Sequence, residues 1–171
     1  MLWTQKIARR MAVLMLCGVF PLLASCQLGA EREFRAVQIC VHDESGVAEL
    51  KALLRALASS EQMNFVDGSA QTTQDLAAIA RKRGKPPPSI PVLNVGVERG
   101  DSMGLTAGNL GLPRYQIAIG FTQGSDQRAA RAFSDRVVSA LGQHWSVEAL
   151  PAGRGALPSP SCDDGSRAGL Q

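Results

Sequence analysis

The first 25 residues constrain this chain most, because their pattern separates them from the part that folds. Lys6, Arg9 and Arg10 give the segment a basic start, and a nearly unbroken apolar run follows from Met11 to Phe20. The apolar stretch spans about 13 to 15 residues, whereas a helix that crosses a membrane needs about 20. A basic start, a short apolar stretch and small residues before a cleavage point are typical of a secretory signal. We therefore expect residues 1–25 to be a removable leader, which leaves about 146 residues to fold.

A cysteine directly follows the expected leader, in the segment Leu23-Ala24-Ser25-Cys26. This tetrapeptide resembles the lipobox of bacterial lipoproteins. The resemblance implies lipidation of the Cys26 thiol, cleavage before it and acylation of the new amino terminus, and several acyl chains anchor a protein stably. Because Gln27 rather than aspartate follows, it also implies the periplasmic face of the outer membrane. The alternative is an ordinary cleaved signal with a coincidental cysteine.

The net charge of the whole chain is +3, but the leader carries this excess. Three of the 18 basic residues and none of the 15 acidic residues lie in the leader, so the remaining chain is formally neutral. A neutral domain gives no electrostatic argument for binding nucleic acid. The local basic run Arg81-Lys82-Arg83 with Lys85 is explained by a solvated helix end, where cations are favourable.

Four cysteines are present, and two of them remain available for pairing. Cys17 lies in the leader and Cys26 is the expected lipid acceptor, so Cys40 and Cys162 are left. In an oxidising compartment an even pair favours a disulfide. We expect a disulfide between Cys40 and Cys162 that ties a Pro- and Gly-rich tail to the domain. Two free thiols are the alternative.

Hydrophobic periodicity predicts the elements of the folded part. Alternating or continuous apolar residues predict strands, and apolar residues three and four apart predict amphipathic helices. The expected strands span 34–41, 64–66, 91–98, 115–121 and 145–150, and the expected helices span 47–60, 72–83 and 126–141. Leu76, Ile79 and Ala80 are expected to form the buried side of the middle helix.

The order of these elements predicts an α+β fold. Strand–helix–strand units at both ends, around a central meander, resemble a ferredoxin-like two-layer sandwich (βαβ-α-ββαβ) with the second helix inserted. An open α/β sheet is the alternative. We expect a tether over 26–33, a single α+β domain over 34–151 and a flexible tail over 152–171.

Residues 99–114 are expected to form a long Gly-rich loop between two strands. A loop of this length inside a compact domain is usually functional. We predict a contact surface with an apolar centre and a charged rim. Its candidate binding residues are Asp101, Asn109, Leu110, Arg114 and Tyr115. The alternative is a self-packed loop whose leucines cover the end of the sheet.

Few residues suggest catalysis. The segment Gly100-Asp101-Ser102-Met103-Gly104 matches the bare Gly-x-Ser-x-Gly pattern, with His144 as a possible base. That motif requires a helix directly after the serine, and no helical pattern follows here. The two histidines, His42 and His144, belong to no converging set of ligands such as a metal site needs. We therefore expect no catalytic residues, no metal and no cofactor.

These expectations describe a membrane-anchored periplasmic lipoprotein that acts as a non-catalytic protein-binding module. Its expected partners are the lipid bilayer, through acylated Cys26, and a protein, with no nucleic acid. The alternatives are an immunity protein against a toxin, an accessory subunit of an envelope assembly, and a serine hydrolase that uses Ser102 and His144.

Overall fold

The computed structural model describes residues 33–87, 91–151, 156–159 and 162. Every described helix and strand lies in one compact unit, Glu31–Gln171, which has its own hydrophobic core. The expected leader, Cys26 and the tether up to residue 32 lie outside the described residues. Within the described part of the chain, no helix is both long enough and apolar enough to cross a bilayer.

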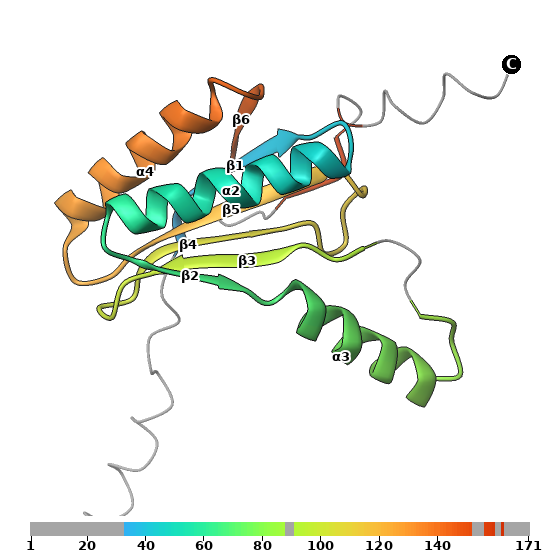
Figure 1. Cartoon of the computed structure of the whole chain (residues 1–171). Coiled ribbons are helices and arrows are strands. Elements are labelled where there is room, and N and C mark those ends of the chain that lie inside the picture. The colour runs from blue at the N-terminus through green and yellow to red at the C-terminus, as the bar shows by residue number, and fades with distance from the viewer. Residues whose placement is uncertain (1–32, 88–90, 152–155, 160–161, 163–171) are drawn as a thin grey trace, which may run out of the picture. The chain divides into compact units, whose positions relative to one another are not determined.

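One six-stranded antiparallel sheet forms the centre of the unit, in the order β2–β3–β4–β5–β1–β6 (Figure 1). The strands are β1 (Glu33–Cys40), β2 (Asn64–Asp67), β3 (Asn94–Glu98), β4 (Met103–Gly108), β5 (Gln116–Gln123) and β6 (Val147–Leu150). Successive side chains of a strand point to opposite faces of the sheet. The large apolar side chains gather on one face, and they include Val37, Ile39, Val95, Val97, Leu105, Ile117, Ile119 and Phe121.

Two helices, α2 (Glu44–Ser60) and α4 (Gln127–Leu141), cover this apolar face (Figure 1). Each begins after an aspartate whose side chain accepts a backbone N–H of the first turn: Asp43 from Gly46, and Asp126 from Ala129. Such caps satisfy donors that the helix itself leaves unpaired. The buried helix residues are Leu50, Leu54 and Ala58 of α2, and Ala130, Phe133, Ser134, Val137 and Leu141 of α4.

The expected α+β class is confirmed: the described residues form an open antiparallel sheet with three helices, but the ferredoxin-like arrangement is not confirmed. The difference is β4, which lies between β3 and β5 where the sequence predicts a loop. Its outward residues include Gly104 and Gly108, and glycine is depleted in strands. A Cβ on Gly104 would collide with the Val97 carbonyl oxygen of the neighbouring strand, so glycine fits this close approach.

Helix α3 (Ser69–Lys82) lies apart from the two helices that cover the sheet (Figure 1). Its first turn is held to Asn94 of β3: the Asn94 side-chain amide donates to Thr72 Oγ1 at 2.8 Å, and the Asn94 backbone N–H donates to Ser69 Oγ at 3.1 Å. None of its residues is buried, so the expected burial of Leu76, Ile79 and Ala80 is wrong.

Asp67, at the end of β2, links the start of α3 to α2 through its carboxylate. Its carboxylate accepts hydrogen bonds from Lys51 Nζ at 2.8 Å and from the Ser69 backbone N–H at 3.1 Å. Burial raises the pKa of Asp67, but the hydrogen bonds from Lys51 and Ser69 outweigh it and lower the pKa to about 2. The folded-state pKa is thus below that of an unfolded aspartate, about 3.9.

We expect Asp67→Asn to destabilise the domain at neutral pH but much less at low pH. The Asp67 carboxylate contributes stability above about pH 4 and loses it as the pH falls towards 2, because the unfolded state then binds the proton more tightly. The contribution is about 1 kcal/mol or less, since the ion pair is partly exposed to solvent. Urea unfolding of both proteins across this pH range measures it, and a pH-independent difference would contradict the assignment.

Candidate binding surface

Asp101 lies in the tight turn between β3 and β4 and is fully engaged there. Arg99 donates to both of its carboxylate oxygens, at 2.7 and 2.6 Å, and the Ser125 hydroxyl donates at 3.0 Å. The hydrogen bonds from the Arg99 guanidinium hold the pKa of Asp101 well below its usual range. These contacts hold the β3–β4 turn against the segment before α4, so the role of Asp101 is structural.

Asn109 is buried just after β4, where its side chain binds three backbone groups. Its Oδ1 accepts from the Leu93 N–H at 2.8 Å, and its Nδ2 donates to the carbonyl oxygens of Pro91 and Arg114 at 3.1 and 2.9 Å. A buried amide is stable only when its polar atoms are paired in this way. Asn109 therefore positions the loop 109–115 on the start of β3.

The other three candidate residues differ in what they contact. Arg114 pairs with Glu44 of α2 and lies over the ring of Tyr115, 5.1 Å from its centroid. Tyr115 packs against the core, and its carbonyl oxygen accepts the Val41 N–H. Leu110 is 65% exposed, so its side chain is available for contact.

The five candidate residues do not form one surface, because residues 99–114 are not a long loop. Asp101 precedes β4, whereas Asn109, Leu110, Arg114 and Tyr115 follow it. The six residues of β4 span about 20 Å, at about 3.3 Å each. The structure thus keeps Leu110 as a candidate contact and gives Asp101 and Asn109 structural contacts.

Ser102 lies in the β3–β4 turn, close to the start of α4, whereas His144 lies just after the end of that helix. The residue next to Ser102, Asp101, is bonded to Ser125 just before α4, and His144 follows the last turn of that helix, with its Nδ1 2.7 Å from Glu49. The helix has 15 residues and so spans about 22 Å. A nucleophile and its base must lie within hydrogen-bond reach, which this separation does not allow.

In the described ranges, no group of three or more His, Cys, Asp or Glu residues is placed to hold a metal ion.

The sheet face opposite α2 and α4 carries small side chains over its central strands. Alternation along the strands places on it Gly96, Thr106, Gly108, Ala118, Gly120 and Thr122. Neither of the two core helices covers this face, as the layers in Figure 1 show. The result is a surface of small side chains, which we call the open face.

A groove of about 500 Å³ runs along the open face beside α3. Its walls carry apolar side chains, namely Val92, Leu110 and Leu112. Thr72 of α3 and Ala156 of the C-terminal segment also line it, while Gly108, Ala118 and Gly120 form its floor. An open concavity with mostly apolar walls and few polar groups is typical of a binding site.

Glu33, the first residue of β1, adds a carboxylate to this groove. Its side chain lies over Gly120, in the space that a Cβ at this glycine would need. Burial raises the pKa of the Glu33 carboxyl above its usual value. The groove therefore combines apolar walls with one partly desolvated acid at its rim.

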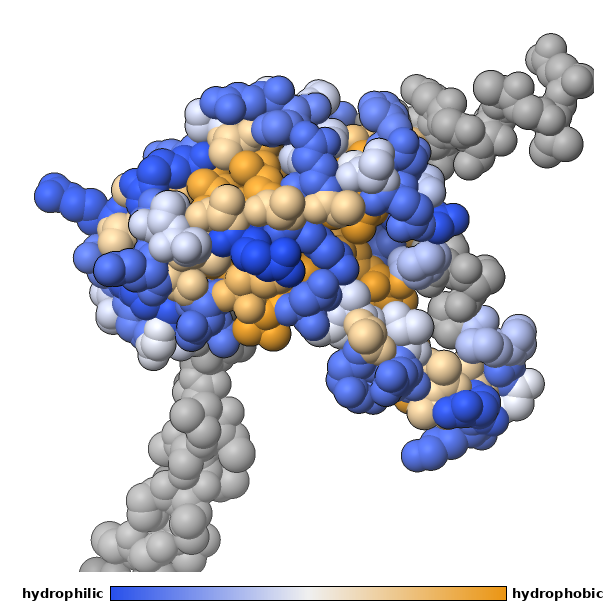
Figure 2. Space-filling model, viewed as in Figure 1, coloured by the Kyte–Doolittle hydropathy of each residue, from blue (hydrophilic) through white to orange (hydrophobic). Residues whose placement is uncertain are grey.

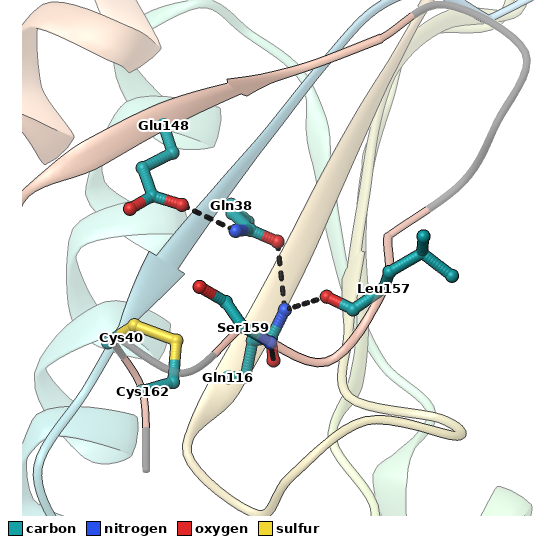
Figure 3. Close-up of a disulfide and its surroundings, with 7 residues drawn as sticks. All are labelled: Gln38, Cys40, Gln116, Glu148, Leu157, Ser159 and Cys162. Atoms are coloured by element: carbon teal, nitrogen blue, oxygen red, sulfur yellow. Dashed lines mark hydrogen bonds between the residues drawn. A yellow bond between two sulfur atoms is a disulfide. The ribbon is translucent and has the colours of Figure 1, made fainter. Parts of the chain in front are cut away.

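The C-terminal segment crosses the other end of the open face and is bonded to it. The disulfide between Cys40 and Cys162 is present, as expected, with a Cα–Cα distance of 5.2 Å (Figure 3). The fully buried side chain of Gln116 donates to the Leu157 carbonyl oxygen at 2.7 Å and accepts the Ser159 N–H at 2.9 Å. The segment is thus fixed to β1 and β5 by a covalent bond and by these hydrogen bonds.

The groove is the feature that sequence reasoning missed. Its signal is present in β4 and β5, where small residues alternate with large apolar ones along each strand. Period-two alternation with glycine, alanine and threonine on one side indicates a strand whose second face is left uncovered. Gly104 and Gly108 favour a loop in the sequence and so conceal this alternation.

No family model, no curated protein and no solved structure matches the chain.

Proposed function

We propose that this protein is a lipoprotein held by acylated Cys26 at the periplasmic face of the outer membrane, where it acts as a non-catalytic protein-binding module. The open antiparallel sheet, rather than a ferredoxin-like sandwich, supplies the surface for this role. The observation that carries the binding role is the apolar groove on the open face, with the exposed Leu110 on its wall.

A binding role fits the chemistry of the described residues better than catalysis does. The pattern-matching Ser102 and the histidine His144 are separated by the length of α4. The strongly perturbed carboxyl, Asp101, is satisfied by a neighbouring arginine within its own turn. The groove, in contrast, offers apolar walls and a small-residue floor, which suit a partner's apolar side chains.

Site-specific photo-crosslinking in the producing cell tests this role. A photoreactive amino acid at Leu110 should give an adduct of discrete mass, because this side chain is exposed at the groove. The matched control is Ala132, which is exposed on α4 of the opposite face. Adducts of equal yield at both positions, or none at Leu110, would argue against the groove as the binding surface.

The captured protein then permits an affinity measurement. We expect Leu110→Ala to weaken binding by about tenfold or more, because burial of a leucine is worth about 1.5 to 3 kcal/mol and about 1.4 kcal/mol corresponds to tenfold. An unchanged Kd would contradict the assignment. A secreted toxin as the captured protein would identify an immunity role, and an envelope component would identify an accessory role in assembly.

A further inference from the structure

Helix α3 is amphipathic, and its apolar side is only partly covered: Leu76 is half-buried, whereas Ile79 is exposed. Leu76 and Ile79 are three residues apart and so lie on one side of the helix, and Ile79 is 46% exposed. Helices shorter than about 12 to 15 residues are marginal in water unless they pack an apolar side against something. Helix α3 has 14 residues and none of them is fully buried, so it has little of this packing among the described residues.

A cluster of cations lies at the far end of α3. Arg81, Lys82, Arg83 and Lys85 are all exposed, and none forms an ion pair with another described residue. No acidic residue occurs between Asp75 and Glu98 in the sequence. Figure 2 shows α3 as a lobe set apart from the body, with strongly hydrophilic residues at its end.

The cations of α3 lie beside its apolar side, one turn towards the end of the helix. Lys82 and Arg83 follow Ile79 by three and four residues, so they flank the Leu76–Ile79 side one turn further on. Attraction of cations to a helix C-terminus is confined to the last turn, and Lys85 lies beyond it. An amphipathic helix with cations beside its apolar side is typical of helices that lie in a membrane interface.

The number of residues between Cys26 and β1 limits how far the folded unit can lie from the expected anchor. Glu33 and Thr72 line the same groove, so the start of β1 and the first turn of α3 lie on the same side of the molecule. Glu33 is the seventh residue after Cys26, and seven residues span at most about 25 Å. Anchoring at Cys26 would therefore keep the start of β1 within about 25 Å of the anchor.

From these observations we infer that α3 lies against anionic phospholipid headgroups of the membrane that holds the anchor. Leu76 and Ile79 enter the interface, and Arg81, Lys82, Arg83 and Lys85 contact the phosphates. The inference rests on the lipid anchor in the proposed function. The anchor makes this contact intramolecular, so a weak intrinsic affinity suffices for high occupancy. The groove then opens beside the bilayer, within reach of a partner that is itself held in the envelope.

Tryptophan placed in α3 of the full-length, acylated protein tests the inference. The variant Ile79→Trp introduces a fluorophore at an exposed position, and Arg128→Trp, exposed on α4, is the matched control. Each protein is reconstituted into vesicles of phosphatidylcholine alone, or with phosphatidylglycerol added, and quenching by brominated lipid is measured. With phosphatidylglycerol we expect quenching of Ile79→Trp to exceed that of the control by about twofold or more.

Three further results decide the inference. The excess quenching should disappear in 1 M NaCl, where the screening length is about 3 Å. It should also disappear when Arg81, Lys82, Arg83 and Lys85 are all changed to Gln. Equal quenching of the two tryptophans in anionic vesicles would overturn the inference. Flotation with neutral vesicles reports the anchor alone, so failure of the anchor and failure of the α3 contact are distinguished.

Discussion

Replacement of Cys162 with serine is expected to lower the free energy of unfolding by about 4 to 5 kcal/mol. The Cys40–Cys162 disulfide joins residues 122 apart, so it encloses most of the folded unit in a covalent loop. In the chain-entropy model, closing a loop of about 100 residues restricts the unfolded chain by about 4.7 kcal/mol. Denaturant unfolding of wild type and variant, without reductant, measures the difference.

Cys40→Ser and the double variant are the matched controls for this prediction. All three variants break the same bond, so their losses should be equal rather than additive. Hydrogen exchange at the Ser159 amide, which donates to Gln116, should also accelerate, because only noncovalent contacts then hold this segment. A loss below about 1 kcal/mol would show that the disulfide contributes little beyond this hydrogen-bonded contact.

The elements that sequence predicts correctly are those with a strong local pattern. Strand β1 and helix α2 follow directly from their apolar spacing. The disulfide follows from counting cysteines in an expected oxidising compartment, which requires no knowledge of the fold. Local spacing determines the helix and the strand because one face of each element must be buried.

The features that sequence predicts wrongly depend on contacts between distant segments. Gly104 in β4 is explained by the closeness of the Val97 carbonyl, which is visible only when β3 and β4 are paired. Likewise, the Leu76–Ile79 pattern predicts an amphipathic helix correctly but does not say whether this chain or a partner covers it. The expected loop over 99–114 is wrong for the first reason, and the expected burial of α3 for the second.

Replacement of Cys26 with alanine is expected to have the largest effect on localisation. Alanine has no thiol to accept the diacylglyceryl group, so this variant lacks the acyl chains that anchor the wild-type protein stably. We therefore expect the protein to move from the membrane fraction to the soluble fraction or to remain as an uncleaved precursor. Cys17→Ala, which changes a leader cysteine outside the Leu23-Ala24-Ser25-Cys26 segment, should leave membrane attachment intact.

Metabolic labelling with radioactive palmitate, combined with mass measurement of the purified product, tests the central claim most directly. The account predicts that wild type and Cys17→Ala incorporate label and begin at an acylated Cys26, whereas Cys26→Ala incorporates none. An unlabelled wild-type product, with the same fractionation as Cys26→Ala, would contradict the membrane anchor and the role built on it.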